Sequence, residues 1–240
     1  MGKKSRRPNR NKPKDIPAAA STAVAAPRQE ETATVIATYN QLCASLDWAG
    51  LLELESEMSA IANNMDYNAP SSAGRINFMI GSAHKLLGGE GGIEQATLYY
   101  EKTNELAKKA GDNEMLSKGG LCLAQCYVET GRVEEAMDLY KSLCEEIGKE
   151  SLHHEAILVF TGALHDNHEI SRALPILEEY LGAIESSWGK RDQCTAYGLI
   201  ATLYRGKNDF AKSNIYFERH LSIAKETKNG ESEASALYGL

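Results

Sequence analysis

The chain has 240 residues, of which 42% are hydrophobic and 25% charged, the balance of a soluble globular protein. Its net charge of −7 is uneven: residues 1–30 hold eight Lys and Arg against two acidic residues, whereas the remainder holds 18 against 31. The acidic remainder argues against broad binding to nucleic-acid phosphates, which needs clustered cations, so only the basic tail is a candidate for contact with RNA, DNA or an anionic surface.

The first element along the chain is an N-terminal tail over residues 1–30. Its basic part, Lys3 to Lys14, is followed by a stretch rich in Ala, Pro, Ser and Thr. Such a composition buries too little apolar surface to offset the entropy lost on ordering, which predicts disorder. We interpret the tail as a solubilising or anionic-surface-binding segment, with a nuclear address and an organellar transit peptide as alternatives.

The five cysteines favour an intracellular location. Their number is odd and their spacing irregular, which is typical of reduced thiols and not of a disulfide framework. The sequence contains no apolar run near the roughly 20 residues of a membrane span, and no secretory signal follows the basic N-terminus. We therefore predict a cytoplasmic protein without a membrane span, and the basic tail keeps a nuclear location open.

From residue 32 onward, apolar residues recur at spacings of three and four, which predicts amphipathic helices and no strands. Clusters of Gly, Asn and Asp interrupt this pattern. At Gly111-Asp112-Asn113, for example, a C-terminal glycine precedes capping residues. We expect helices over 32–46, 48–64, 71–88, 93–110, 113–129, 132–147, 152–166, 171–186, 191–205, 209–227 and from 231 onward.

These helices form a repeat, because pairs of large residues in alternate helices recur at spacings of 40, 37 and 40. The pairs are Tyr99-Tyr100, Leu139-Tyr140, Ile176-Leu177 and Tyr216-Phe217. The best copy carries Ala124, Tyr127, Gly131, Ala136, Tyr140 and Leu143, and the next carries Ala201, Tyr204, Asn208, Ser213, Phe217 and His220. A poorer copy between them has Thr161, Leu164, His168, Ala173, Leu177 and Tyr180. The small residues let paired helices approach to roughly 8–10 Å.

This pattern resembles the tetratricopeptide repeat. Its period of about 40 residues, instead of the usual 34 or so, is similar to the long-repeat class of kinesin light chain and the Pins-type scaffolds, most clearly over residues 210–240. The resemblance implies an all-α fold: a right-handed α-α superhelix of antiparallel helix pairs over residues 31–240. About five pairs and the start of a sixth fit this length.

The resemblance also implies a function, that of a non-enzymatic scaffold or adaptor. The first helix of each pair would line a concave groove, which binds a peptide or a helix of a partner protein. The residues that the resemblance assigns to the groove are Arg75, Phe78, Lys85, Lys118, Leu121, Gln125, Glu129, Leu158, His165, Thr202 and Arg205.

The sequence predicts no catalytic, cofactor or metal site. His154 and His165 lie eleven residues apart, about 16 Å along a helix, which one ion cannot bridge. Cys122 and Cys126 are interpreted as packing groups, because no second cysteine pair completes a zinc site. The glycine-rich segment 88–92 follows a helix and lacks the Lys-Ser/Thr of a P-loop.

Two alternative functions remain open. The chain ends in mid-repeat, since Tyr238-Gly239-Leu240 matches Tyr197-Gly198-Leu199 at an offset of 41 residues. The repeat is therefore alternatively the regulatory or targeting arm of a longer multidomain protein, with an effector module after residue 240. The other alternative is an RNA-associated protein that docks through the basic tail.

Overall fold

The computed structural model describes residues 29–65, 69–87, 89 and 91–240, with side chains from residue 34 onward. This part of the chain contains thirteen α-helices, one short 3-10 helix and no strand, which confirms the predicted all-α class. The disorder predicted for the tail concerns residues that lie outside the described part, except that the first helix already begins at Gln29.

The helix bounds agree with the expected ones except at two breaks. The helices are α1 (Gln29–Ser45), α2 (Trp48–Glu53), α3 (Glu55–Met65), α4 (Pro70–Leu87), α5 (Gly92–Ala110), α6 (Asn113–Glu129), α7 (Val133–Ile147), the 3-10 helix η1 (Lys149–Ser151), α8 (His154–Asp166), α9 (Ile170–Glu179), α10 (Leu181–Ser186), α11 (Lys190–Gly206), α12 (Phe210–Glu226) and α13 (Gly230–Gly239). The expected helix 48–64 is divided at Leu54, and 171–186 is divided at Tyr180. At Tyr180 the N–H bonds to the carbonyl of Leu177, three residues back, which tightens the turn and ends α9.

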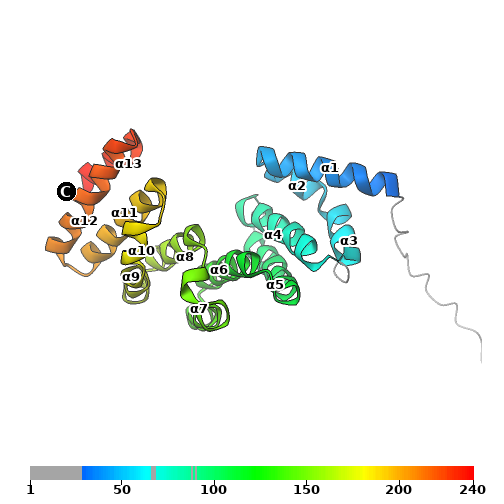
Figure 1. Cartoon of the computed structure of the whole chain (residues 1–240), viewed down its shortest axis with the longest axis horizontal. Helices are drawn as coiled ribbons and strands as arrows, with labels where there is room; N and C mark the ends of the chain where they lie inside the picture. The colour runs from blue at the N-terminus through cyan, green and yellow to red at the C-terminus, as the bar shows by residue number, and fades with distance from the viewer. Residues whose placement is uncertain (1–28, 66–68, 88, 90) are drawn as a thin grey trace, which may run out of the picture.

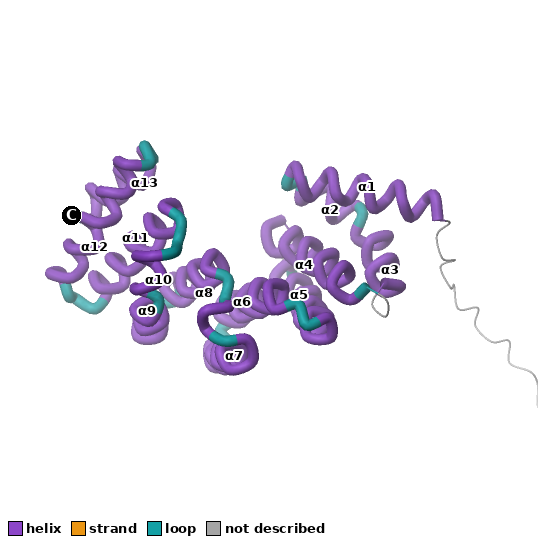
Figure 2. The backbone as a smooth tube through the Cα atoms, in the orientation of Figure 1, coloured by secondary structure: helices purple, strands orange, loops and turns teal. Residues whose placement is uncertain are grey.

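The described helices form a one-dimensional array. Most helices pack against their neighbours in the chain, and the first helices of successive pairs also touch: α4 with α6, α6 with α8, α8 with α11, and α11 with α13. The array is curved, with α1 and α13 at its two ends (Figure 1). Short connections join the helices, and α4, α6, α8 and α11 lie on the inner side of the curve while α5, α7, α9 and α12 lie outside (Figure 2). Contacts of this local kind are typical of repeat proteins.

Three turns within the helix pairs repeat the same backbone geometry. Gly131, His168 and Asn208 have φ values of 78°, 64° and 60°, in the left-handed region. Each lies two residues after one helix and two before the next. One N–H to carbonyl bond recurs around all three, from Arg132 to Tyr127, Glu169 to Leu164 and Asp209 to Tyr204, at 2.7, 2.8 and 3.0 Å. These positions are the ones that the sequence pattern equates, so the repeat is a feature of the backbone as well.

Small residues bring the helices of a pair together, as the pattern predicts. Ala124 of α6 and Ala136 of α7 are both fully buried. A Cβ atom on Gly120 would lie 2.7 Å from the side chain of Leu143 on α7, a distance that leaves no room for it. Large side chains fill the space beside these close approaches, and Tyr140 packs on Phe160 with ring centroids 5.7 Å apart. The inner helices are thus held at fixed positions along the curve.

Candidate functional site

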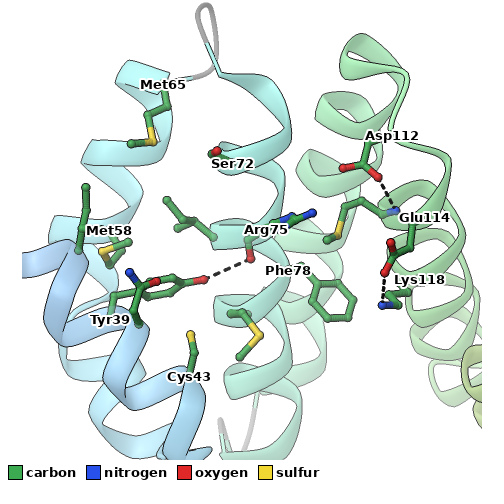
Figure 3. A pocket seen from close by; sticks show the side chains of 15 residues that line it. Tyr39, Cys43, Met58, Met65, Ser72, Arg75, Phe78, Asp112, Glu114 and Lys118 are labelled. Carbon is green, nitrogen blue, oxygen red and sulfur yellow. Dashed lines mark hydrogen bonds and ion pairs between the residues drawn. The ribbon is translucent and has the colours of Figure 1, made fainter.

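A hydrophobic hollow of about 560 Å³ opens between α1, α3, α4 and α6 (Figure 3). Of the residues predicted for the groove, it brings together Arg75, Phe78 and Lys118. Its apolar lining is Ile36, Tyr39, Cys43, Met58, Met65, Ile76, Phe78, Met79 and Met115. Methionine is flexible and polarisable, so a surface of this kind adapts to apolar side chains of different shapes.

The rim of the hollow is charged. The Lys118 ammonium lies 2.6 Å from a carboxylate oxygen of Glu114, one turn away on α6. Asp112 caps α6 by accepting the N–H of Met115 at 3.0 Å, and it also accepts the hydroxyl of Ser71. These hydrogen bonds, of which that from Ser71 has the larger effect, hold the pKa of Asp112 below its usual range. Both contacts are made within the chain, so the carboxylate already has its hydrogen-bond donors.

Arg75 differs from the other charged residues at this rim. It is exposed, and no carboxylate of the described residues lies within ion-pair distance of its guanidinium. Its backbone carbonyl accepts a bond from the Tyr39 hydroxyl of α1, at 3.4 Å. The guanidinium is therefore available to an acidic group of a ligand, beside an apolar surface.

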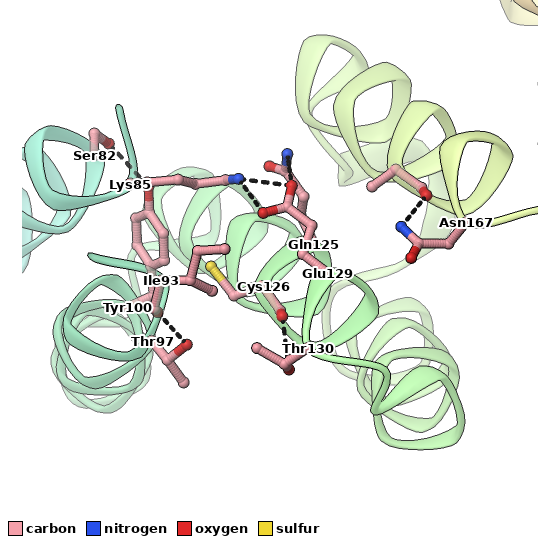
Figure 4. A network of polar contacts seen from close by, with 11 residues as sticks. Ser82, Lys85, Ile93, Thr97, Tyr100, Gln125, Cys126, Glu129, Thr130 and Asn167 are labelled. Atoms are coloured by element: carbon pink, nitrogen blue, oxygen red, sulfur yellow. Dashed lines mark hydrogen bonds and ion pairs between the residues drawn. The ribbon is translucent and has the colours of Figure 1, made fainter. Parts of the chain in front are cut away.

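A polar network joins the C-terminal ends of α4 and α6 (Figure 4). The Lys85 ammonium of α4 lies 2.7 and 2.8 Å from the two carboxylate oxygens of Glu129 on α6. The Gln125 amide donates to the same carboxylate at 2.8 Å. These three predicted groove residues are thus brought together, but they satisfy one another and tie α4 to α6. Their first role is structural.

A second, more polar hollow of about 880 Å³ lies between α8, α11, α12 and α13. It contains two further predicted residues, Leu158 and Thr202. Its other polar lining includes Arg191, Thr195, Asn229, Glu231, Ser232 and Ser235. Its lining has a larger polar share than that of the methionine-lined hollow, and none of its described lining residues is a methionine.

Three predicted groove residues are placed otherwise. Leu121 has no exposed area, because it points into the core of the array, and it therefore presents no surface to a partner. His165 pairs with the neighbouring Asp166 at 2.9 Å. Arg205 donates to the carbonyl of Gly239 and lies over the ring of Phe217, so it is used to hold α13.

Cys122 and Cys126, one turn apart on α6, are poor nucleophiles. Burial raises the pKa of Cys122 to about 12 and that of Cys126 to about 11. A thiolate, which is the reactive form, is therefore scarce at neutral pH. Both side chains belong to the packing between α5 and α6.

The sequence pattern missed the contribution of α1 and α3 to the methionine-lined hollow. None of the repeat copies described from the sequence includes α1 or α3, so Tyr39, Met58 and Met65 could not be placed opposite α4. Methionines at inward positions of predicted helices are the one signal that could have indicated them.

A scan against protein-family models and a search of curated proteins each give no match to this chain. None of the described helices has both the length and the apolar character required to cross a bilayer.

Proposed function

We propose that this chain is a tetratricopeptide-like, right-handed superhelical scaffold that binds a partner protein and performs no reaction itself. The observation that supports this most directly is the methionine-lined hollow on the inner side of the curve. It is an apolar surface beside the unpaired Arg75 guanidinium, where α1, α3, α4 and α6 meet. Apolar surface with a few polar groups beside it is typical of sites that bind peptides or helices.

The partner presents an extended peptide or one face of an amphipathic helix. Large apolar side chains enter the hollow and contact the partly exposed Phe78 and Met79 side chains, which lie beside the buried Met58 and Met115, while polar groups remain at the rim. The inner helices are fixed by their contacts with the outer ones, so the site is largely formed before binding. A preformed site binds without the cost of ordering its own backbone.

We also propose a cytoplasmic location. All five cysteines lie in the described part of the chain, and all are unpaired there. Free thiols of this number are typical of proteins in reducing compartments.

Selection of peptides from a displayed library against the whole chain tests the proposed site. We expect Met79→Gln and Arg75→Ala each to weaken the selected peptides at least about tenfold, because an interface anchor contributes roughly 1.4 kcal/mol or more. Leu98→Gln is the matched control, since Leu98 is an exposed apolar residue of the outer helix α5. Equal binding by all three variants, or loss in the control alone, would place the partner elsewhere.

A further inference from the structure

Three potential metal ligands converge where α8 and α11 begin. The Nε2 atom of His154 lies 2.9 Å from a carboxylate oxygen of Asp192, and Glu155 is next to His154 in the chain. One ligand atom from each of the three residues lies within 4.8 Å of the other two. We propose that this cluster binds a divalent transition-metal ion, with Zn²⁺ as the ion to test.

The imidazole of His154 is held in position by its neighbours. It stacks on His153 with ring centroids 5.2 Å apart and planes 8° apart. On another side it contacts the indole of Trp188, with centroids 5.3 Å apart. The carboxylate side chain of Asp192 is only 16% exposed. Two of the three ligands are therefore preorganised, which lowers the cost of assembling the site.

The ligand set suits zinc better than calcium or magnesium. A neutral imidazole and two carboxylates balance the charge of a divalent ion, and three protein ligands leave a fourth position for water. Ligand atoms around a tetrahedral zinc lie about 3.3 Å apart, so small side-chain rotations complete the geometry. Calcium and magnesium need about six oxygen ligands, more than the cluster provides.

Two other histidine–carboxylate pairs in the described part of the chain show what distinguishes this cluster. His84 pairs with Glu55 at 3.0 Å, and His165 pairs with Asp166 at 2.9 Å. Neither pair has a third ligand atom nearby among the described residues, whereas the His154 pair has Glu155. Pairs of two ligands bind zinc weakly, so they serve as internal controls.

Metal binding here would act on the array and not on a substrate. His154 belongs to α8 and Asp192 to α11, which are the first helices of successive pairs and touch each other. An ion bound to both would fix the angle between these pairs and stabilise the folded chain by mass action. The positive ends of both helices oppose a cation, and the two carboxylates offset them.

Calorimetric titration of Zn²⁺ into the untagged, chelator-treated whole chain tests the site. We expect one ion to bind per chain and Tm to rise with zinc. A chelator should reverse the rise in Tm. Asp192→Asn and Glu155→Gln should each weaken binding at least tenfold, and His165→Asn should leave it unchanged. Co²⁺ spectra provide a second readout of the ligand geometry.

The Glu155→Gln variant keeps the test valid if Asp192→Asn fails to fold, because the Glu155 side chain is exposed and lies outside the hydrophobic core. Retention of full zinc affinity by Glu155→Gln and Asp192→Asn would overturn the proposal. Loss of binding in His165→Asn, or no binding to the unaltered chain, would overturn it as well.

Discussion

The tripeptide Tyr-Gly-Leu occurs twice, once within α11 and once at residues 238–240, where α13 ends. Its tyrosine is buried in the first copy and exposed in the second. Tyr197 of α11 is 5% exposed, and its ring lies 6.1 Å from that of Tyr216 and beneath Arg219 of α12. Tyr238, its equivalent after 41 residues, is 92% exposed. The two tyrosines have the same sequence neighbours, so their different burial depends on whether a neighbouring helix covers the ring.

The packing of α13 is one-sided. Gly239 is buried against α12, since a Cβ atom there would lie 2.4 Å from the ring of Phe217. Among the described helices, α13 touches α11 and α12, whereas α11 also touches α8, α9 and α10. Elements with fewer neighbours open at lower free energy, so stability should fall from the middle of the array toward α13.

Removal of the two tyrosine rings gives the largest expected effect. Tyr197→Ala should lower the free energy of unfolding by about 3 kcal/mol, because it leaves a cavity between α11 and α12. Tyr238→Ala should change it by less than about 0.5 kcal/mol, since an exposed ring contributes little. Urea denaturation followed by circular dichroism measures both. Similar losses in the two variants would contradict the role of the neighbouring helix.

Glycines extend the comparison between covered and uncovered positions. Gly120→Ala should lower the free energy of unfolding by about 1–2 kcal/mol, because the new methyl group meets Leu143. Gly182 of α10 has no atom within 4 Å of an added Cβ. Gly182→Ala should therefore raise stability by about 0.5–1 kcal/mol through helix propensity. The same denaturation experiment checks this, and an equal effect of the two changes would argue against the close approach of α6 and α7 at Gly120.

A smaller effect is expected for the pH dependence of the free energy of unfolding, through a histidine buried between α11 and α12. Burial lowers the pKa of His220, a buried α12 residue whose ring contacts α11 at Gly198. Below about pH 6.5 the unfolded chain binds a proton that the folded chain does not, so stability is full above this pH and falls as the pH decreases. His220→Asn should reduce the slope of unfolding free energy between pH 7 and 5.5. The control is His168→Asn, because His168 is exposed. An equal reduction of the slope in this control would contradict the assignment of the pH dependence to His220.

Local chemistry was sufficient to predict the helices but not what they bring together. Glycine and capping residues, such as Gly111 and Asp112, act within a few positions, so the bounds could be read from the sequence. The approach of Asp192 to His154 spans 38 residues and depends on how α8 and α11 pack, which the pattern does not contain. For the same reason, the resemblance to the tetratricopeptide repeat placed Leu121 in the groove, although α6 turns it into the core.

Only some of the residues that line the methionine-lined hollow could be predicted from the sequence. Arg75, Phe78 and Lys118 follow from the repeat, because they occupy inward positions on well-formed helices. Tyr39 and Met58 come from α1 and α3, which none of the repeat copies described from the sequence includes, and Leu54 divides the helix expected over 48–64. Their position could only be obtained from the packed structure.

Hydrogen exchange with and without a selected peptide tests the central claim, that a partner binds the methionine-lined hollow, most directly. The account predicts slower exchange in α3, α4 and the first turns of α6, around Met58, Met79 and Met115, because these segments line the hollow. It also predicts unchanged exchange in the outer helices α7 and α12. Protection confined to those outer helices, or none at the hollow, would contradict it.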